Sequence, residues 1–144
     1  VAVDTETGLI EITDHFGGSD AGTIMNPRAA YNQMTSFFAG LDVAIREETV
    51  WDKWDNKVLN PNLIEYKART FNEAPPHDHV CLESTKGRES DFPFGAMGIG
   101  EPIISPSGPA ITMAVYNACG IELEEYPYLP AKVLAALKEK EDRA

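Results

Sequence analysis

With 144 residues and 43% hydrophobic content, the chain is long enough to bury one compact core, and we expect residues 1–144 to form a single domain. The formal net charge of −11 makes phosphate backbones and anionic membrane surfaces poor partners. The sequence has no signal-peptide pattern and no run of about 18 apolar residues. We therefore expect a cytoplasmic protein, cut or processed from a longer polypeptide, that binds neither nucleic acid nor membranes.

The first residues predict a β-hairpin. Residues 1–4 and 9–15 alternate apolar and polar side chains, as half-buried strands do, and Gly8 ends the turn between them. The glycine-rich residues 16–22 follow, and we expect a flexible connection there.

A long amphipathic helix is predicted next. Asn26 is a good helix cap, and Pro27 suits the first helical position because its missing N–H needs no partner there. From residue 28 to about 47 the pattern is helical. Apolar side chains recur at spacings of three and four, which places them on one face: Met34, Phe37, Phe38, Leu41 and Ile45.

The middle of the chain is less regular. Residues 49–51 and 57–59 flank the polar residues 52–56, and together they predict a second hairpin. Residues 60–76 are interrupted by prolines and predict an irregular segment, whereas residues 80–83 predict a short strand.

The C-terminal third predicts two helices and a strand. Residues 105–107 offer helix caps, Pro109 a helix opening and Gly120 a stop. Residues 121–125 predict a strand, and Pro130 opens a last helix that runs through Lys140. Because helices and strands are mixed without regular alternation, the predicted fold class is α+β.

Cysteine and histidine give little sign of a metal site. Cys81 and Cys119 lie far apart without CxxC spacing, which excludes a self-contained iron–sulfur or zinc site. A disulfide and two reduced thiols both fit, and a cytosolic protein favours the thiols. His77 and His79 would share a face of a strand, but they lack a third placed ligand and the neighbouring prolines favour a loop. We predict no metal bound by this chain's own side chains.

The most informative segment is residues 94–102, FGAMGIGEP. Its glycines fit neither the dinucleotide fingerprint nor the phosphate loop, but they let the backbone turn tightly and approach another molecule closely. Glu101 stands between Gly100 and Pro102, just before a predicted helix, and a carboxylate held in such a loop suits a general base. The alternative is a solvent-exposed glutamate on a turn.

Residues 95–102 (GAMGIGEP) resemble the glycine–glutamate–proline segment in the large subunit of the xanthine dehydrogenase and aldehyde oxidase family of molybdenum hydroxylases. In that family the glutamate lies beside molybdenum and takes up a proton during hydroxylation, with water as the oxygen source. The resemblance implies that Glu101 is the catalytic base and that Ile99 and Gly100 bind the cofactor. Many relatives carry a lysine where this chain has Met97.

Further segments resemble the same family in the same order. Residues 19–22, then Asn26 and Pro27, then Gln33 match its Asp-x-Gly, Asn-Pro and downstream glutamine. The resemblance implies that Asn26 and Gln33 bind the pterin, since an amide both donates and accepts hydrogen bonds. The alternative for Gln33 is a polar residue on the outer face of a helix.

The sequence departs from the family just after Gln33. Relatives usually continue with an acidic residue, two glycines and a second glutamine. Here residues 35–39 read TSFFA, and phenylalanines stand where small residues normally allow close approach to the cofactor.

Residues 57–67, 103–120 and 126–137 also match, so the resemblance covers nearly the whole chain. It implies the second half of a molybdopterin-binding domain of the xanthine dehydrogenase type. The chain would supply one wall of the molybdenum–molybdopterin site and the base of an enzyme that oxidises a heterocycle or an aldehyde, and we expect no activity from the chain alone.

Other parts of such an enzyme have no signature in this sequence. The rest of the molybdopterin site is expected on the remaining segment of the subunit, and the iron–sulfur clusters and FAD on partner subunits. Two alternatives remain. One is a degenerate, non-catalytic assembly or scaffold domain, suggested by the altered residues 35–39, and the other is a small-molecule binding module that uses the glycine loop.

Overall fold

The computed structural model describes residues 1–82 and 92–143. The mixture of helices and strands confirms the predicted α+β class. None of the helices within these ranges is long and apolar enough to cross a membrane. The elements in chain order are β1 (Ala2–Val3), β2 (Ile10–Glu11), β3 (His15–Asp20), α1 (Pro27–Met34), α2 (Phe37–Ile45), α3 (Leu63–Tyr66), the 3-10 turn η1 (Phe71–Glu73), β4 (His77–Leu82), the 3-10 turn η2 (Pro93–Gly95), α4 (Ile104–Cys119) and α5 (Pro130–Asp142).

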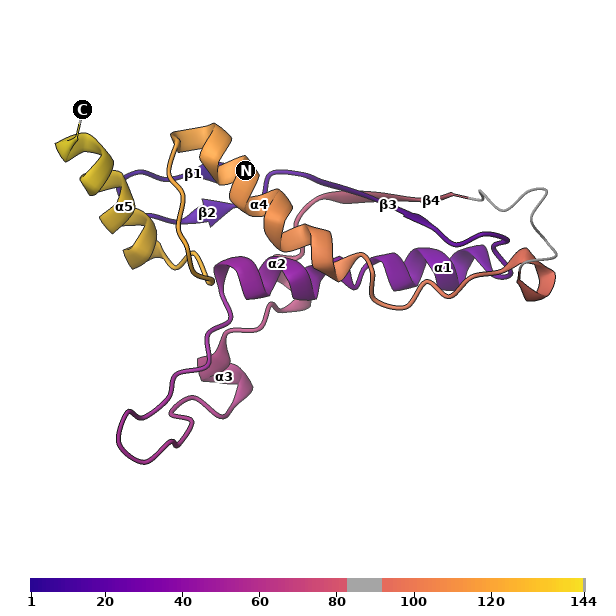
Figure 1. Ribbon diagram of the computed structural model, residues 1–144, viewed down its shortest axis with the longest axis horizontal. Coiled ribbons are helices and arrows are strands. Elements are labelled where there is room, and N and C mark those ends of the chain that lie inside the picture. Colours follow the sequence, from indigo (N-terminus) through magenta and orange to yellow (C-terminus); the bar gives the residue numbers. More distant parts are fainter. Residues whose placement is uncertain (83–91, 144) are drawn as a thin grey trace.

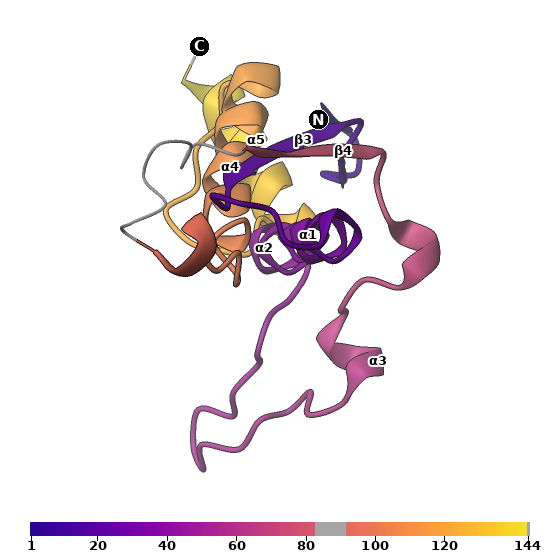
Figure 2. The same cartoon turned by 90° about the vertical axis from the view of Figure 1, so that its right-hand side faces the viewer.

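The molecule is elongated (Figure 1). The β3–β4 pair and α1 form one end, the β1–β2 hairpin and α5 form the other, and α2 packs against α4 between them. Residues 47–70, which carry α3, leave this body and return to it as an arm, which Figure 2 shows hanging away from α1 and α2.

The core lies where α2 crosses α4. Phe37, Leu41 and Val115 are fully buried there. Gly40 allows the close crossing, because a Cβ at this position would lie 2.2 Å from the carbonyl oxygen of Ile104. The two helices therefore meet backbone to backbone at Gly40.

The helix predicted from residue 28 to about 47 is two helices. At Thr35 and Ser36 the hydrogen bonds span three residues and not the four of an α-helix. The two N–H groups donate to the carbonyls of Asn32 and Gln33, at 3.1 Å each. The hydroxyl of Thr35 also donates to the Asn32 carbonyl (2.6 Å). Threonine competes in this way for a backbone acceptor, which explains why α1 ends at Met34 and α2 begins only at Phe37.

The predicted flexible connection at residues 16–22 and the predicted loop at His77 and His79 are wrong. Both segments form strands, and β3 pairs with β4 in parallel, from His15 opposite His77 to Asp20 opposite Leu82. The β4 strand thus begins three residues before the predicted 80–83, of which residue 83 lies outside the described residues. Because the two paired segments lie about 60 residues apart, neither sequence segment by itself shows which partner it will pair with.

The first predicted hairpin is confirmed with shorter strands, whereas neither residues 49–51 nor residues 57–59 form a strand in the second. In the first, Val3 lies opposite Ile10 in the antiparallel β1–β2 pair. In the second, Trp51 and Val58 form an antiparallel bridge.

In the C-terminal third, α5 begins at Pro130 as predicted, and Gly120 ends α4 with φ +67°. The predicted opening of α4 at Pro109 is wrong, because the helix already begins at Ile104 and Pro109 lies inside it. The strand predicted at residues 121–125 is also absent from the described structure. The hydroxyl of Tyr128 binds both the N–H (3.0 Å) and the carbonyl (2.9 Å) of Leu123, so a side chain takes the bonds a neighbouring strand would make.

Of the two cysteines, Cys119 has a free thiol, which confirms the reduced state expected for it. Its Sγ donates to the Val115 carbonyl at 3.3 Å.

Candidate functional site

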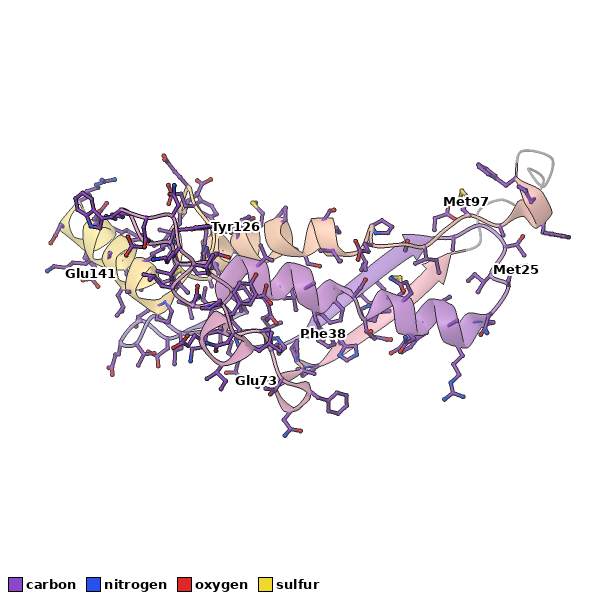
Figure 3. The ribbon with its side chains drawn as sticks, turned by 90° about the horizontal axis from the view of Figure 1, so that it is seen from below. Met25, Phe38, Glu73, Met97, Tyr126 and Glu141 are labelled. Carbon is purple, nitrogen blue, oxygen red and sulfur yellow. The ribbon has the colours of Figure 1, made fainter. Side chains whose placement is uncertain are left out.

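The glycine loop, defined here as residues 92–101, is bound to the chain just before α1. Gly22 and Ala96 form an antiparallel bridge. On either side of it, the N–H of Thr23 donates to the Gly95 carbonyl (2.8 Å) and that of Met97 to the Ala21 carbonyl (3.0 Å). Figure 3 shows the result, with Met25 and Met97 at the same end of the molecule. Two segments about 75 residues apart thus form one surface through backbone hydrogen bonds.

Gln33 reaches the same loop from α1. Its Nε2 donates to the carbonyl oxygen of Gly100 at 2.6 Å. Two residues that the family resemblance implied as cofactor ligands therefore touch each other, and the next residue along the loop is Glu101.

A hollow of about 270 Å³ lies between the glycine loop and α1. Of the predicted site residues, Asn26, Gln33 and Ile99 line it, and small side chains such as Ala29 and Ala96 keep it open. Pockets that enclose a small molecule usually measure about 300 Å³ or more. This hollow is smaller than such pockets.

The backbone of the glycine loop is open on one side. Within the part of the chain that the structure describes, the N–H groups of residues 98–101 donate no hydrogen bond. A Cβ placed on Gly98 would meet no atom within 4 Å. A row of free donors beside open space lets a polar molecule approach the backbone closely.

Glu101 lies on an exposed turn directly before α4, and its carbonyl accepts the N–H of Ile104 at 3.0 Å. Its carboxylate has no hydrogen-bond or ion-pair partner among residues 1–82 and 92–143. Glu101 is not part of the wall of the hollow. In this chain it is thus an exposed glutamate on a turn.

Asn26 serves the helix as well as the hollow. Its Oδ1 accepts the N–H of Ala29 at 3.1 Å and caps α1, as predicted. Its amide nitrogen has no partner among the described residues and remains available to a ligand.

All three histidines gather around Phe37, which the sequence did not predict. Phe37 stacks on His15 (ring centroids 4.0 Å apart) and contacts His79 (4.8 Å) and His77 (5.4 Å). Residues 15–20 read HFGGSD, which shows no alternation of apolar and polar side chains that could have predicted β3. Among residues 1–82 and 92–143, no group of three potential ligands is placed to hold a metal ion.

Burial lowers the pKa of both His15 and His79, and neighbouring histidines lower it further. Asp14 acts in the opposite direction on His15, as Asp78 does on His79. Burial therefore disfavours the protonated form of His15 and of His79. Phe37 and Phe38 belong to it and not to the wall of the hollow, so they do not fill the space beside the glycine loop.

Comparison with known proteins matches residues 1–75 to the model of a molybdopterin cofactor-binding domain. The chain is 32% identical over 139 residues to the probable hypoxanthine oxidase XdhD of Escherichia coli (strain K12), covering 96% of the chain and 14% of that protein. It is 30% identical over 138 residues to the aldehyde oxidoreductase molybdenum-binding subunit PaoC of the same organism, covering 95% of the chain and 19% of that protein. The chain thus spans less than a fifth of the length of these relatives.

Solved structures match the fold over nearly the whole chain. Quinoline 2-oxidoreductase from Pseudomonas putida 86 matches with a TM-score of 0.82 at 22% identity, over 95% of this chain and 17% of that one. Aldehyde oxidoreductase from Desulfovibrio gigas matches with a TM-score of 0.74 at 28% identity, over 94% of this chain and 14% of that one.

Proposed function

The chain belongs to the molybdopterin cofactor-binding domain family, and we propose that it supplies one wall of the cofactor site and the catalytic base of a molybdenum hydroxylase. The proposed reaction oxidises a heterocycle or an aldehyde and takes its oxygen atom from water. The contact between Gln33 and the Gly100 carbonyl carries this proposal, because it joins two family segments directly beside Glu101.

The residues around the hollow suit a pterin. A flat heterocycle rich in hydrogen-bonding groups can pair with the free N–H groups of residues 98–101 and with the amide of Asn26. Ile99 would hold it from the side of the loop, and Gln33 lines the wall on the side of α1. When bound, the molybdenum cofactor would supply the redox chemistry.

Glu101 would accept a proton in this reaction. Its carboxylate has no competing partner among the described residues, and its backbone is fixed on one side by Pro102 and by the hydrogen bond from Ile104. A carboxylate without a competing partner, carried on a restrained backbone, can serve as a general base.

The site is incomplete in this chain. The hollow is one wall, Glu101 is exposed, and the chain spans 14% of the length of XdhD and 19% of that of PaoC. We propose that the rest of the pterin site comes from the remaining segment of the subunit, and that iron–sulfur and flavin subunits carry electrons onward. The isolated chain should have no hydroxylase activity.

The test is Glu101→Gln in the assembled, cofactor-loaded enzyme. Turnover should fall by orders of magnitude, while molybdenum and pterin contents stay at the wild-type level. Glu141→Gln, at the far end of the molecule in Figure 3, is the matched control and should leave turnover unchanged. Near-normal turnover of a metal-loaded Glu101→Gln enzyme would rule out the base.

A scaffold domain is the competing proposal, and Phe37 and Phe38 no longer favour it, because they pack with the histidines. Molybdenum analysis of the purified complex that contains this chain separates the two. A stable complex without molybdenum and pterin would support the scaffold.

A further inference from the structure

Gln33 forms the only side-chain hydrogen bond to residues 97–101 among the described residues. Its acceptor, the Gly100 carbonyl, belongs to the peptide group that joins Gly100 to Glu101. Because a peptide group is planar, a donor that fixes the carbonyl oxygen also fixes the nitrogen of Glu101. Gln33 therefore acts on the backbone of Glu101 and not on its carboxylate.

The backbone of Glu101 is then held at both ends. Gln33 fixes the peptide before it, and the N–H of Ile104 fixes its carbonyl at 3.0 Å. Gly100 has φ +49°, which glycine adopts readily, and because glycine leaves the backbone flexible, a hydrogen bond to its carbonyl restricts the path of the loop.

Gln33 stands on a rigid support. The helix α1 is capped by Asn26, and its Ala30 and Met34 are buried. On the same helix, the Tyr31 ring contacts His79 on β4 (centroids 5.9 Å apart). A donor on a packed helix defines the position of its acceptor more precisely than a donor on a loop.

We propose that Gln33 is a positioning residue, which sets the direction of the Glu101 carboxylate through the Gly100 carbonyl. This inference rests on the proposed function of Glu101. It differs from a role of Gln33 as a pterin ligand, since a positioning residue can be lost without loss of the cofactor.

The experiment uses the assembled, cofactor-loaded enzyme with Gln33→Met, which keeps the length of the side chain but removes the donor. Misplacing a catalytic group by about 1 Å costs up to about 100-fold in rate. We expect kcat to fall by about 10- to 100-fold, with KM within about twofold of wild type and with wild-type molybdenum and pterin contents. Asn32→Met is the matched control, because Asn32 is an exposed amide on the same helix whose side chain makes no hydrogen bond in the described structure, and it should leave kcat unchanged.

The decisive measurement is the double variant Gln33→Met/Glu101→Gln. If Gln33 acts through Glu101, the double variant should turn over no more slowly than Glu101→Gln alone. Multiplied losses, or loss of molybdenum and pterin from Gln33→Met, would overturn the positioning role and leave the base intact. Near-normal turnover of Glu101→Gln would instead remove the proposed base, and the positioning role with it.

Discussion

Asp42 and Arg69 form an ion pair that uses both carboxylate oxygens of Asp42. Arg69 Nε lies 2.8 Å from Oδ1, and the backbone N–H of Arg69 donates to Oδ2 at 3.0 Å. Both side chains are almost fully buried. The guanidinium also donates to the Glu73 carbonyl at 2.6 Å. This pair fastens the returning end of the arm to α2.

Replacing Asp42 should therefore destabilise the fold strongly. Asp42→Ala leaves the guanidinium of Arg69 without its partner in a buried position, and breaking such a pair typically costs about 3–5 kcal/mol. Urea denaturation should show a loss of unfolding free energy of this order. The matched control is Asp55→Ala, which breaks the exposed pair with Lys57 and should have a much smaller effect. Equal losses in the two variants would contradict the role of the buried pair.

A second prediction concerns the crossing of α2 and α4. Gly40→Ala places a methyl group 2.2 Å from the carbonyl oxygen of Ile104, so the helices must move apart, and overpacking of this kind costs about 1–3 kcal/mol. Thermal unfolding should show a clearly lower midpoint for this variant. Gly98→Ala is the comparison, since its methyl group meets nothing within 4 Å, and its midpoint should stay near that of wild type.

A third prediction follows from the histidine cluster. The pKa of His15 and that of His79 are lowered in the folded chain from the ordinary value of 6.5, so the folded state binds protons less readily than the unfolded state. The stability that this provides is fully present above pH 6.5 and is lost as the pH falls toward the lowered folded pKa values. Unfolding free energies measured across this range should decrease on acidification.

The control for this prediction is His15→Phe, which keeps a ring against Phe37 but removes one titrating group. Its stability should depend less on pH than that of wild type. An unchanged slope would show that carboxylates elsewhere, and not the cluster, cause the acid sensitivity.

Local signals in the sequence were sufficient for the ends of several helices. Asn26 caps α1, Gly120 ends α4 and Pro130 opens α5, because each acts through its own backbone conformation or its nearest neighbours. The same reasoning failed at Pro109, where α4 continues through the proline as it packs against α2.

Contacts between distant segments could not be predicted in this way. The parallel pairing of β3 with β4 and the bond from Gln33 to Gly100 both depend on the folded path of the chain. Family resemblance placed Gln33 and Gly100 around one cofactor, but the residues alone carried no sign that they touch. The helical periodicity also did not show that Phe37 packs against the histidines and not beside the hollow, because it predicts which side chains are buried but not which residues they contact.

The glycine loop is bound to residues 21–23, which precede α1, by main-chain atoms, and Met97 contributes its N–H to these bonds. A lysine at the same position would form an identical link. Side chains along this part of the loop can therefore diverge between relatives without moving the main chain. In evolution the exposed surface of this loop can thus change while its path is inherited.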